Sequence, residues 1–354
     1  MNIRFLLTIA NAILINFSFA CDFCGCYMGI TPYDNQSSIS FLYRYKSFNG
    51  YPHTNQHNQL FPAAHQSMIY NSNTTSNSSN QINQNIFGQR HGSNALPTAT
   101  PLKTQKDYEV YTTAELRVKY FIHQRIELNA VAPLVTNYNR VNENKQTING
   151  VGDITAFAAY HLISKVLTEK YQHRLIIGAG IKLPVGDYYQ KGKDNQRIDF
   201  LLQTGTGSVD YLTYANYIFG YKKFGFNFNS NVKINGENYY HEKIGNSSTN
   251  YLNVFFKFRE GKNLKLFPSI QGYYEYSKGL YINNELQPAT QMNIACGGVG
   301  LDMFYKNFTL NMSFQLPVYE KKYESNLENS CKAMVGLTYS FNQMKYLLKS
   351  KKQE

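Results

Sequence analysis

Residues 308–316 read Phe-Thr-Leu-Asn-Met-Ser-Phe-Gln-Leu, an unbroken alternation of apolar and polar side chains. Successive side chains of a β-strand point to opposite faces, so this stretch predicts a strand with one apolar and one polar face. The same alternation recurs in residues 109–120, 224–229, 252–259 and 333–341. Two classes of protein contain many strands of this kind: a secreted β-sandwich or propeller, and a membrane-spanning β-barrel.

The composition agrees with a chain of aromatic strands. Among 354 residues there are 30 Tyr, 23 Phe and no Trp, and charged residues make up only 16%, against about 25% in typical soluble domains. The mean hydropathy is −0.43. No stretch after residue 20 approaches the roughly 18 consecutive apolar residues of a spanning helix, which excludes a helical membrane bundle. The aromatic content also argues against wholesale disorder.

The order of strands and loops separates the two classes. We predict about twelve strands, near residues 37–47, 107–121, 125–137, 152–163, 173–184, 208–220, 224–236, 250–259, 265–277, 291–305, 308–319 and 331–341. Their connections alternate between tight turns and long loops, as in a membrane barrel with short periplasmic turns and long extracellular loops. Closure pairs every backbone group within lipid. We therefore expect an all-β, transmembrane antiparallel β-barrel in the outer membrane of a Gram-negative-type bacterium, with both termini periplasmic.

The chain divides into four segments. Residues 1–20 have the charge, apolar core and small-x-small ending of a secretory signal peptide. Residues 21–36 form a cysteine-containing segment, and residues 37–341 form the barrel. Within the barrel, residues 48–106 are a long low-complexity extracellular loop. Residues 342–354 are a basic tail.

Three cysteines open the expected mature chain: Cys21, Cys24 and Cys26. This spacing suits a disulfide, a soft metal ion bound by thiolates, or a lipid anchor at Cys21. The long loop contributes a second group of metal-ligating side chains, His53, His57 and His65. The cysteines would be periplasmic and the histidines extracellular, so the two groups cannot share one ion. We expect no other cofactor. Of the two later cysteines, Cys296 and Cys331, each is either a small buried residue or half of a disulfide.

The polar faces of the predicted strands hold the candidate selectivity residues, because lumen-facing side chains tune selectivity in such barrels. These are Arg44, Glu115, Arg117, Lys119, Glu127, Lys182, Lys233, Lys257, Arg259 and Glu275. Cations outnumber carboxylates, which favours anionic solutes; the alternative is an ion-paired lumen without net preference. The whole chain carries 35 Lys+Arg and 23 Asp+Glu, a net charge of +12. For an exported chain, the expected partners are outer-membrane lipid or lipopolysaccharide and a small solute, not nucleic acid.

Glycine and proline motifs carry a resemblance to a known family. The segments are Gly150-Val151-Gly152-Asp153, Leu183-Pro184-Val185-Gly186-Asp187 and Gln203–Ser208, with strand-end prolines in Ala132–Val135 and Leu316–Tyr319. Over roughly residues 107–341, the chain resembles the outer-membrane transporters of the phenol meta-pathway family. The resemblance implies an outer-membrane barrel with a transport role and aromatic solutes.

The same motifs predict local backbone features. We expect Gly152 and Gly186 to adopt positive φ angles in turns, and Asp153 and Asp187 to accept hydrogen bonds from nearby backbone N–H groups.

The sequence therefore predicts a transporter or channel for small solutes, anionic or aromatic. Two alternatives are a structural or adhesive surface barrel with a plugged lumen and a barrel that handles a soft metal or metal chelate. We find no enzyme motif and predict no enzymatic activity. A barrel enzyme would need a Ser/His or Asp/His constellation near the rim, where His161 and His241 are the only candidates and neither has an evident partner.

Overall fold

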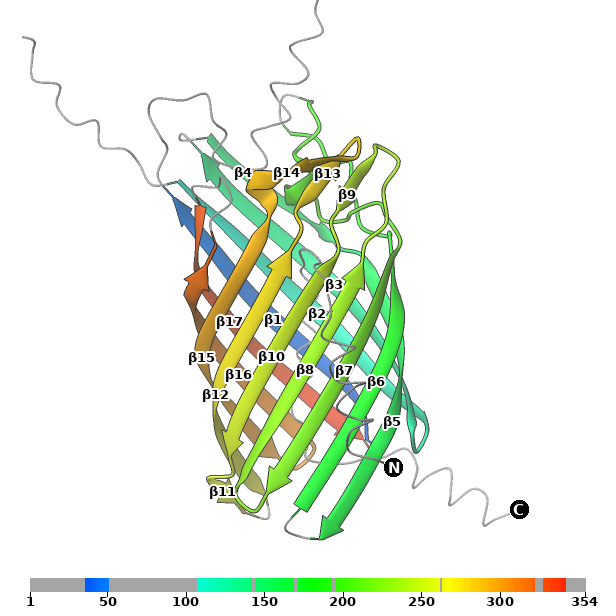
Figure 1. Cartoon of the computed structure of the whole chain (residues 1–354), viewed down its shortest axis with the longest axis vertical. Helices are drawn as coiled ribbons and strands as arrows, with labels where there is room; N and C mark the ends of the chain where they lie inside the picture. The colour runs from blue at the N-terminus through cyan, green and yellow to red at the C-terminus, as the bar shows by residue number, and fades with distance from the viewer. Residues whose placement is uncertain are drawn as a thin grey trace, which may run out of the picture.

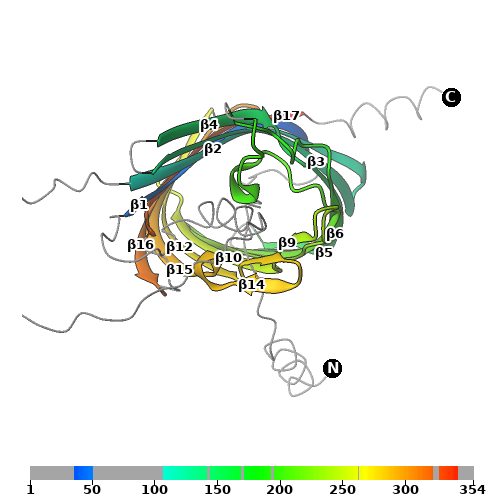
Figure 2. The same cartoon turned by 90° about the horizontal axis from the view of Figure 1, so that it is seen from above.

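The computed structural model describes residues 36–50, 107–141, 144–168, 171–192, 195–261, 263–321 and 327–341. In this part of the chain, twelve long antiparallel strands close into a barrel (Figures 1 and 2). They are β1 (Ser37–Gly50), β2 (Asp107–His123), β3 (Ile126–Val141), β5 (Ile154–Thr168), β6 (Tyr171–Leu183), β7 (Asp210–Tyr221), β8 (Phe224–Ile234), β10 (Ser247–Phe256), β12 (Leu264–Ser277), β15 (Met292–Tyr305), β16 (Phe308–Glu320) and β17 (Leu327–Phe341).

The barrel closes between its first and last strands. β1 pairs with β2 on one side and with β17 on the other, and β10 pairs with both β8 and β12. Closure pairs each of these twelve strands on both sides, and a free strand edge would not be tolerated in lipid. Ser37 lies opposite Phe341, so the barrel begins and ends at one rim. The predicted all-β fold and its twelve strands are confirmed.

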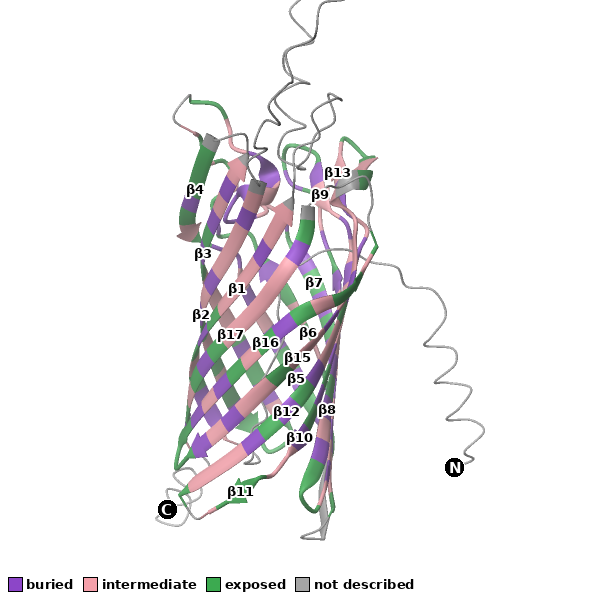
Figure 3. Cartoon of the chain, turned by 90° about the vertical axis from the view of Figure 1, so that its left-hand side faces the viewer, coloured by how far each residue is buried: buried purple, intermediate pink, exposed green. Residues whose placement is uncertain are grey.

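The alternating pattern of residues 308–316 separates the two faces of β16. Phe308, Phe314 and Leu316 are exposed on the outer surface, whereas Asn311 and Gln315 are buried inside. Buried and exposed residues alternate in the same way along the other strands (Figure 3). The apolar face therefore points to lipid and the polar face to the lumen.

The two rims of the barrel differ in the length of their connections. The rim with tight turns, here named the short-turn rim, holds the connections at residues 222–223 and 306–307. It also holds β11 (Arg259–Glu260), which pairs with the start of β12. The opposite rim, named the long-loop rim, lies at the top of Figure 1 and holds the longer connections. No helix in the described ranges is long and apolar enough to span a membrane.

Several predicted loops at the long-loop rim are ordered as strands. Residues 138–151 were expected to form a loop, but β3 continues to Val141 and pairs with β4 (Asn144–Val151). A short separate sheet consists of β9 (Glu242–Ile244), β13 (Leu280–Ile282) and β14 (Glu285–Gln287). Most side chains of β4 are polar, and Ile148 is a buried apolar residue within it.

Candidate functional site

A cavity of about 480 Å³ lies inside the barrel. Strand alternation points polar side chains into it, and the structure places eight of the ten predicted lumen residues on its wall. They are Arg44, Glu115, Arg117, Lys119, Glu127, Lys182, Lys233 and Glu275. Their role in selectivity remains a prediction.

Two predicted lumen residues lie elsewhere. Lys257 and Arg259 do not line the cavity, because β10 ends at Phe256 and the chain turns there. Lys257 is paired with Glu260 at 3.7 Å, and Arg259 is exposed in β11. Their assignment to the lumen was wrong, since the alternating sequence pattern continues past the point where the strand stops.

One carboxylate in the cavity is shared by two arginines. Glu115 accepts a hydrogen bond from Arg44 Nη2 on one oxygen, and its other oxygen lies 2.7 Å from Arg117 Nε and 2.5 Å from Arg117 Nη2. The Glu115 side chain is only 3% exposed, whereas Arg44 is 19% exposed. The carboxylate therefore lies behind its cations, against the wall.

A second carboxylate is shared by two lysines. Glu275 Oε2 lies 2.9 Å from Lys332 Nζ and 3.8 Å from Lys46 Nζ, and it accepts a 2.8 Å hydrogen bond from Tyr273. Lys46 and Lys332 are directly opposite each other in the β1–β17 register, a position where like charges repel. Glu275 comes from β12, which β15 and β16 separate from β17, and relieves this repulsion. Glu275 is 2% exposed, against 22% for Lys46.

These two clusters give the cavity a cationic surface. Each combines two cations with one carboxylate, and in each the cations are the more accessible groups. At these two clusters a solute therefore meets guanidinium and ammonium groups before carboxylates, although the lumen contains both signs of charge.

The loop between β6 and β7 folds into the barrel, although we expected residues 185–207 to form an extracellular loop. Its residues 200–206 contribute to the cavity wall, and η2 (Phe200–Leu202) is buried there. The loop therefore narrows the lumen at the long-loop rim.

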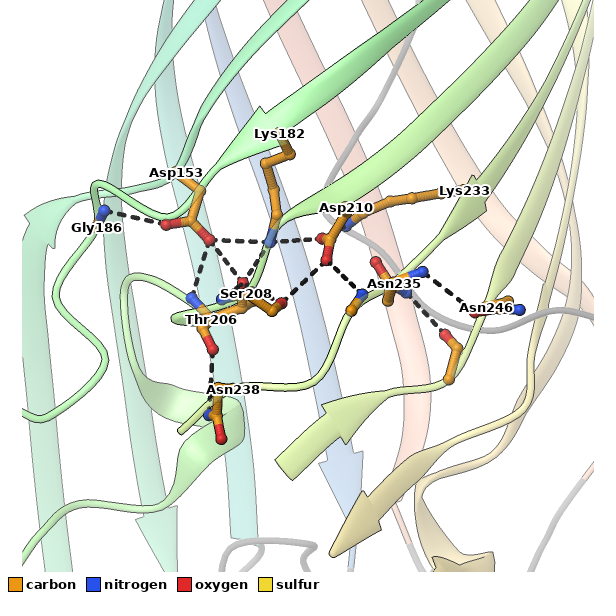
Figure 4. A network of polar contacts seen from close by, with 12 residues as sticks. Asp153, Lys182, Gly186, Thr206, Ser208, Asp210, Lys233, Asn235, Asn238 and Asn246 are labelled. Carbon is orange, nitrogen blue, oxygen red and sulfur yellow. Dashed lines mark hydrogen bonds and ion pairs between the residues drawn. The ribbon is translucent and has the colours of Figure 1, made fainter. Parts of the chain in front are cut away.

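A buried polar network, here named the loop latch, fixes this loop (Figure 4). Asp153 accepts hydrogen bonds from the backbone N–H of Gly186 (3.0 Å) and of Thr206 (2.9 Å), and from the Thr206 hydroxyl (2.8 Å). Lys182 bridges Asp153 (2.9 Å) and Asp210 (2.6 Å). The loop is thus tied to the starts of β5 and β7. The expectation that Asp153 binds backbone N–H groups is confirmed, and Asp187 likewise accepts from Tyr189 N–H.

The glycines of the motifs serve close packing. Among the glycines of the described ranges, positive φ angles occur only at Gly207 and Gly279, so the turns expected at Gly152 and Gly186 are wrong. A Cβ on Gly205 would lie 2.4 Å from the carbonyl carbon of Gly186, and one on Gly152 would lie 2.9 Å from Pro133. These glycines allow the loop backbone to contact itself and the barrel wall.

Asp199 is a buried acid in the same loop. Its Oδ1 accepts a 2.8 Å hydrogen bond from Leu201 N–H, so that Asp199 is the N-cap residue of η2. Burial, together with the negative charges of Glu109 and Glu242, raises its pKa from 3.8 to about 7. Because the pKa is raised, the folded loop favours the protonated acid. The contribution of Asp199 to the stability of the loop is fully present below pH 3.8 and is lost as the pH rises towards about 7.

His161 and His241, the two histidines that a barrel enzyme could use, both have carboxylate neighbours. His161 Nε2 lies 3.1 Å from Glu127 Oε2 inside the barrel, and His241 Nδ1 lies 2.5 Å from Glu237 on the surface. The sequence did not reveal these partners. In the barrel, Asn129 and Tyr214 also donate to Glu127, at 3.2 Å and 3.4 Å, so this carboxylate belongs to a wall network.

The residues expected to bind a metal ion lie outside the described part of the chain. This applies to Cys21, Cys24 and Cys26 and to His53, His57 and His65. Within the described ranges, no group of three or more His, Cys, Asp or Glu is arranged to hold a metal ion. Cys296 and Cys331 are both free thiols, so the two are not paired with each other.

Sequence reasoning missed several cavity residues. Lys46 and Lys332 follow the inward alternation of β1 and β17, so their position was a usable signal. Thr206 reaches the lumen only because its loop folds inward, so no periodic pattern marks it.

The closed barrel with an inward polar face defines an outer-membrane β-barrel. No family model and no curated protein matches the sequence. Among solved structures, an outer membrane channel from Pseudomonas putida F1 is similar, with a TM-score of 0.59 and 12% identity over 90% of this chain and 98% of that chain. This similarity supports the fold implied by the family resemblance, and the expected outer-membrane localisation is confirmed.

Two further solved structures match more distantly. The β domain of the Bordetella autotransporter BrkA has a TM-score of 0.42 and 9% identity, over 86% of this chain and 100% of that one. The translocator domain of the autotransporter NalP from Neisseria meningitidis has a TM-score of 0.38 and 6% identity, over 96% and 94%.

Proposed function

We propose that this barrel is a channel, and not an enzyme, that conducts small anionic solutes across the outer membrane. The observation that carries the proposal is the shared-carboxylate arrangement. Glu115 and Glu275 each lie between two cations and are nearly inaccessible, whereas the cations face the cavity. In a space with low-dielectric walls, such exposed charges attract mobile ions of the opposite sign.

The ion pairs also keep these cations in place. Lys332 crosses from β17 to Glu275 on β12, and its ammonium group lies 3.9 Å from the centre of the Tyr273 ring. A cation held by a carboxylate and an aromatic face is already ordered, so its side chain loses little further conformational entropy when a solute binds. The inward loop adds a constriction, so solutes that pass must come close to this surface.

The test compares two solutes of nearly equal size. Both carry a sulfonate, but isethionate has a hydroxyl group where taurine has an ammonium group. Isethionate is therefore an anion, and taurine is neutral overall. In proteoliposomes made permeable to K⁺ with valinomycin, we expect isethionate to pass faster than taurine. Equal rates, or faster taurine, contradict the proposal.

Two variants assign the preference to the cavity. Lys46→Met with Lys332→Met removes cavity cations and is expected to slow isethionate towards the taurine rate. Lys257→Met removes a lysine at the short-turn rim, outside the cavity, and is expected to leave both rates unchanged. If Lys257→Met slows isethionate as much as the double substitution, the preference arises from overall charge and not from this site.

A further inference from the structure

A second polar surface faces the cavity opposite the arginines. Asn216 on β7 and Asn229 and Asn231 on β8 line the cavity wall and are each at least nine-tenths buried. Asn216 and Asn229 are register partners, and Asn231 follows Asn229 on the same face. We name these three residues the amide cluster.

Each member of the amide cluster uses only part of its hydrogen-bonding capacity. Asn231 Nδ2 donates to Asn229 Oδ1 at 3.1 Å, and Asn216 Nδ2 donates to Asn227 Oδ1 at 2.9 Å. Among the described residues, Asn229 Nδ2, Asn216 Oδ1 and Asn231 Oδ1 have no partner. One donor group and two acceptor atoms of these cavity-lining side chains are therefore buried without a hydrogen-bond partner. This mixture suits hydroxyl groups, because a hydroxyl both donates and accepts.

The strand register connects the amide cluster to the group of Lys46, Lys332 and Glu275, here named the lysine cluster. Asn229 pairs with Tyr251 on β10, and Tyr251 pairs with Tyr273 on β12, over whose ring Lys332 lies. In the next row Asn231 pairs with Thr249, and Thr249 pairs with Glu275. Two strand spacings, about 10 Å along the wall, separate the amide cluster from Tyr273 and Glu275, which the ammonium group of Lys332 contacts. A six-carbon chain with a hydrogen bond at each end spans that distance.

We propose that the cavity contains a binding site for small polyhydroxylated acids, of the sugar-acid class, whose carboxylate meets Lys46 and Lys332 and whose hydroxyls bind the amide cluster. This inference rests on the proposed function, since it names the solute class of the same lumen. It adds that hydroxyl groups, and not charge alone, determine which anions are retained.

The test measures how two acids inhibit isethionate flux. Gluconate and hexanoate have the same number of carbons and one carboxylate, but only gluconate carries hydroxyls along its chain. We expect gluconate to inhibit at a lower concentration than hexanoate. Asn229→Leu is expected to weaken inhibition by gluconate roughly three- to tenfold, the effect of one lost hydrogen bond, and to leave inhibition by hexanoate unchanged.

The controls separate the two proposals. Thr309→Val changes another cavity-lining residue, on β16, and is expected to leave the inhibition by both acids unchanged. Asn231→Ser keeps a hydrogen-bonding group and provides a second measurement if Asn229→Leu does not fold. Equal inhibition by gluconate and hexanoate, or no inhibition by either, overturns the inference. The proposed function fails separately, if isethionate shows no advantage over taurine.

Discussion

The loop latch can be tested by replacing Asp153 with Ala. Its carboxylate accepts three hydrogen bonds from the β6–β7 loop and pairs with buried Lys182. Removing one partner of a buried ion pair costs about 3–5 kcal/mol, because the other charge is left without compensation. Asp210 still faces Lys182, so we expect the lower part of that range. The loss falls on the loop and not on the barrel, whose strands remain fully paired.

The assay is hydrogen exchange of the backbone N–H groups that Asp153 binds, those of Gly186 and Thr206. Protection of a locally opening segment falls tenfold for each 1.4 kcal/mol. A loss of about 3 kcal/mol therefore predicts roughly a hundredfold faster exchange in the loop, with unchanged exchange in the strands. Asp187→Ala is the matched control, since this exposed acid of the same loop accepts one local hydrogen bond from Tyr189. Unchanged loop exchange in a folded Asp153→Ala barrel, or equal acceleration in both variants, would refute the reasoning.

Three further predictions follow from the site. Glu275→Gln removes the charge that its two lysines share, so anion selectivity measured by reversal potential should increase; a decrease contradicts the shared-carboxylate model. Gly205→Ala places a Cβ against the Gly186 backbone, so exchange in the loop should accelerate by at least tenfold, and unchanged exchange would show that the contact is adaptable. Raising the pH from 5 to 8 ionises Asp199, whose pKa is about 7, so loop exchange, corrected for its intrinsic pH dependence, should be faster at pH 8. Asp199→Asn should abolish that difference, and persistence of the difference would assign it to another group.

The barrel could be predicted from sequence because its pattern has a simple physical cause. A period of two that recurs along the chain, with alternating short and long connections between the strands, leaves few folds that pair every backbone group. The same period placed Arg44, Glu115 and Glu275 inside the barrel. It failed at Lys257 and Arg259, because strand ends depend on pairing with neighbouring strands and not on alternation.

The interactions within the lumen could not be predicted in the same way. Glu275 and Lys332 are 57 positions apart in the sequence and lie on non-adjacent strands, so their pairing depends on the curvature of the closed barrel. The inward loop depends on the close contact of Gly186 with Gly205 and on Asp153, and we had expected turns at such glycines. Loop position is decided by these tertiary contacts, for which the sequence carries no period.

The central claim, that accessible cations make the lumen anion-selective, is tested most directly by one measurement. The unmodified protein is inserted into a planar bilayer that separates two KCl solutions of different concentration, and the reversal potential is recorded. We predict a potential of the sign that shows chloride to be more permeant than potassium. A potential that shows preference for potassium, or none, would contradict the account.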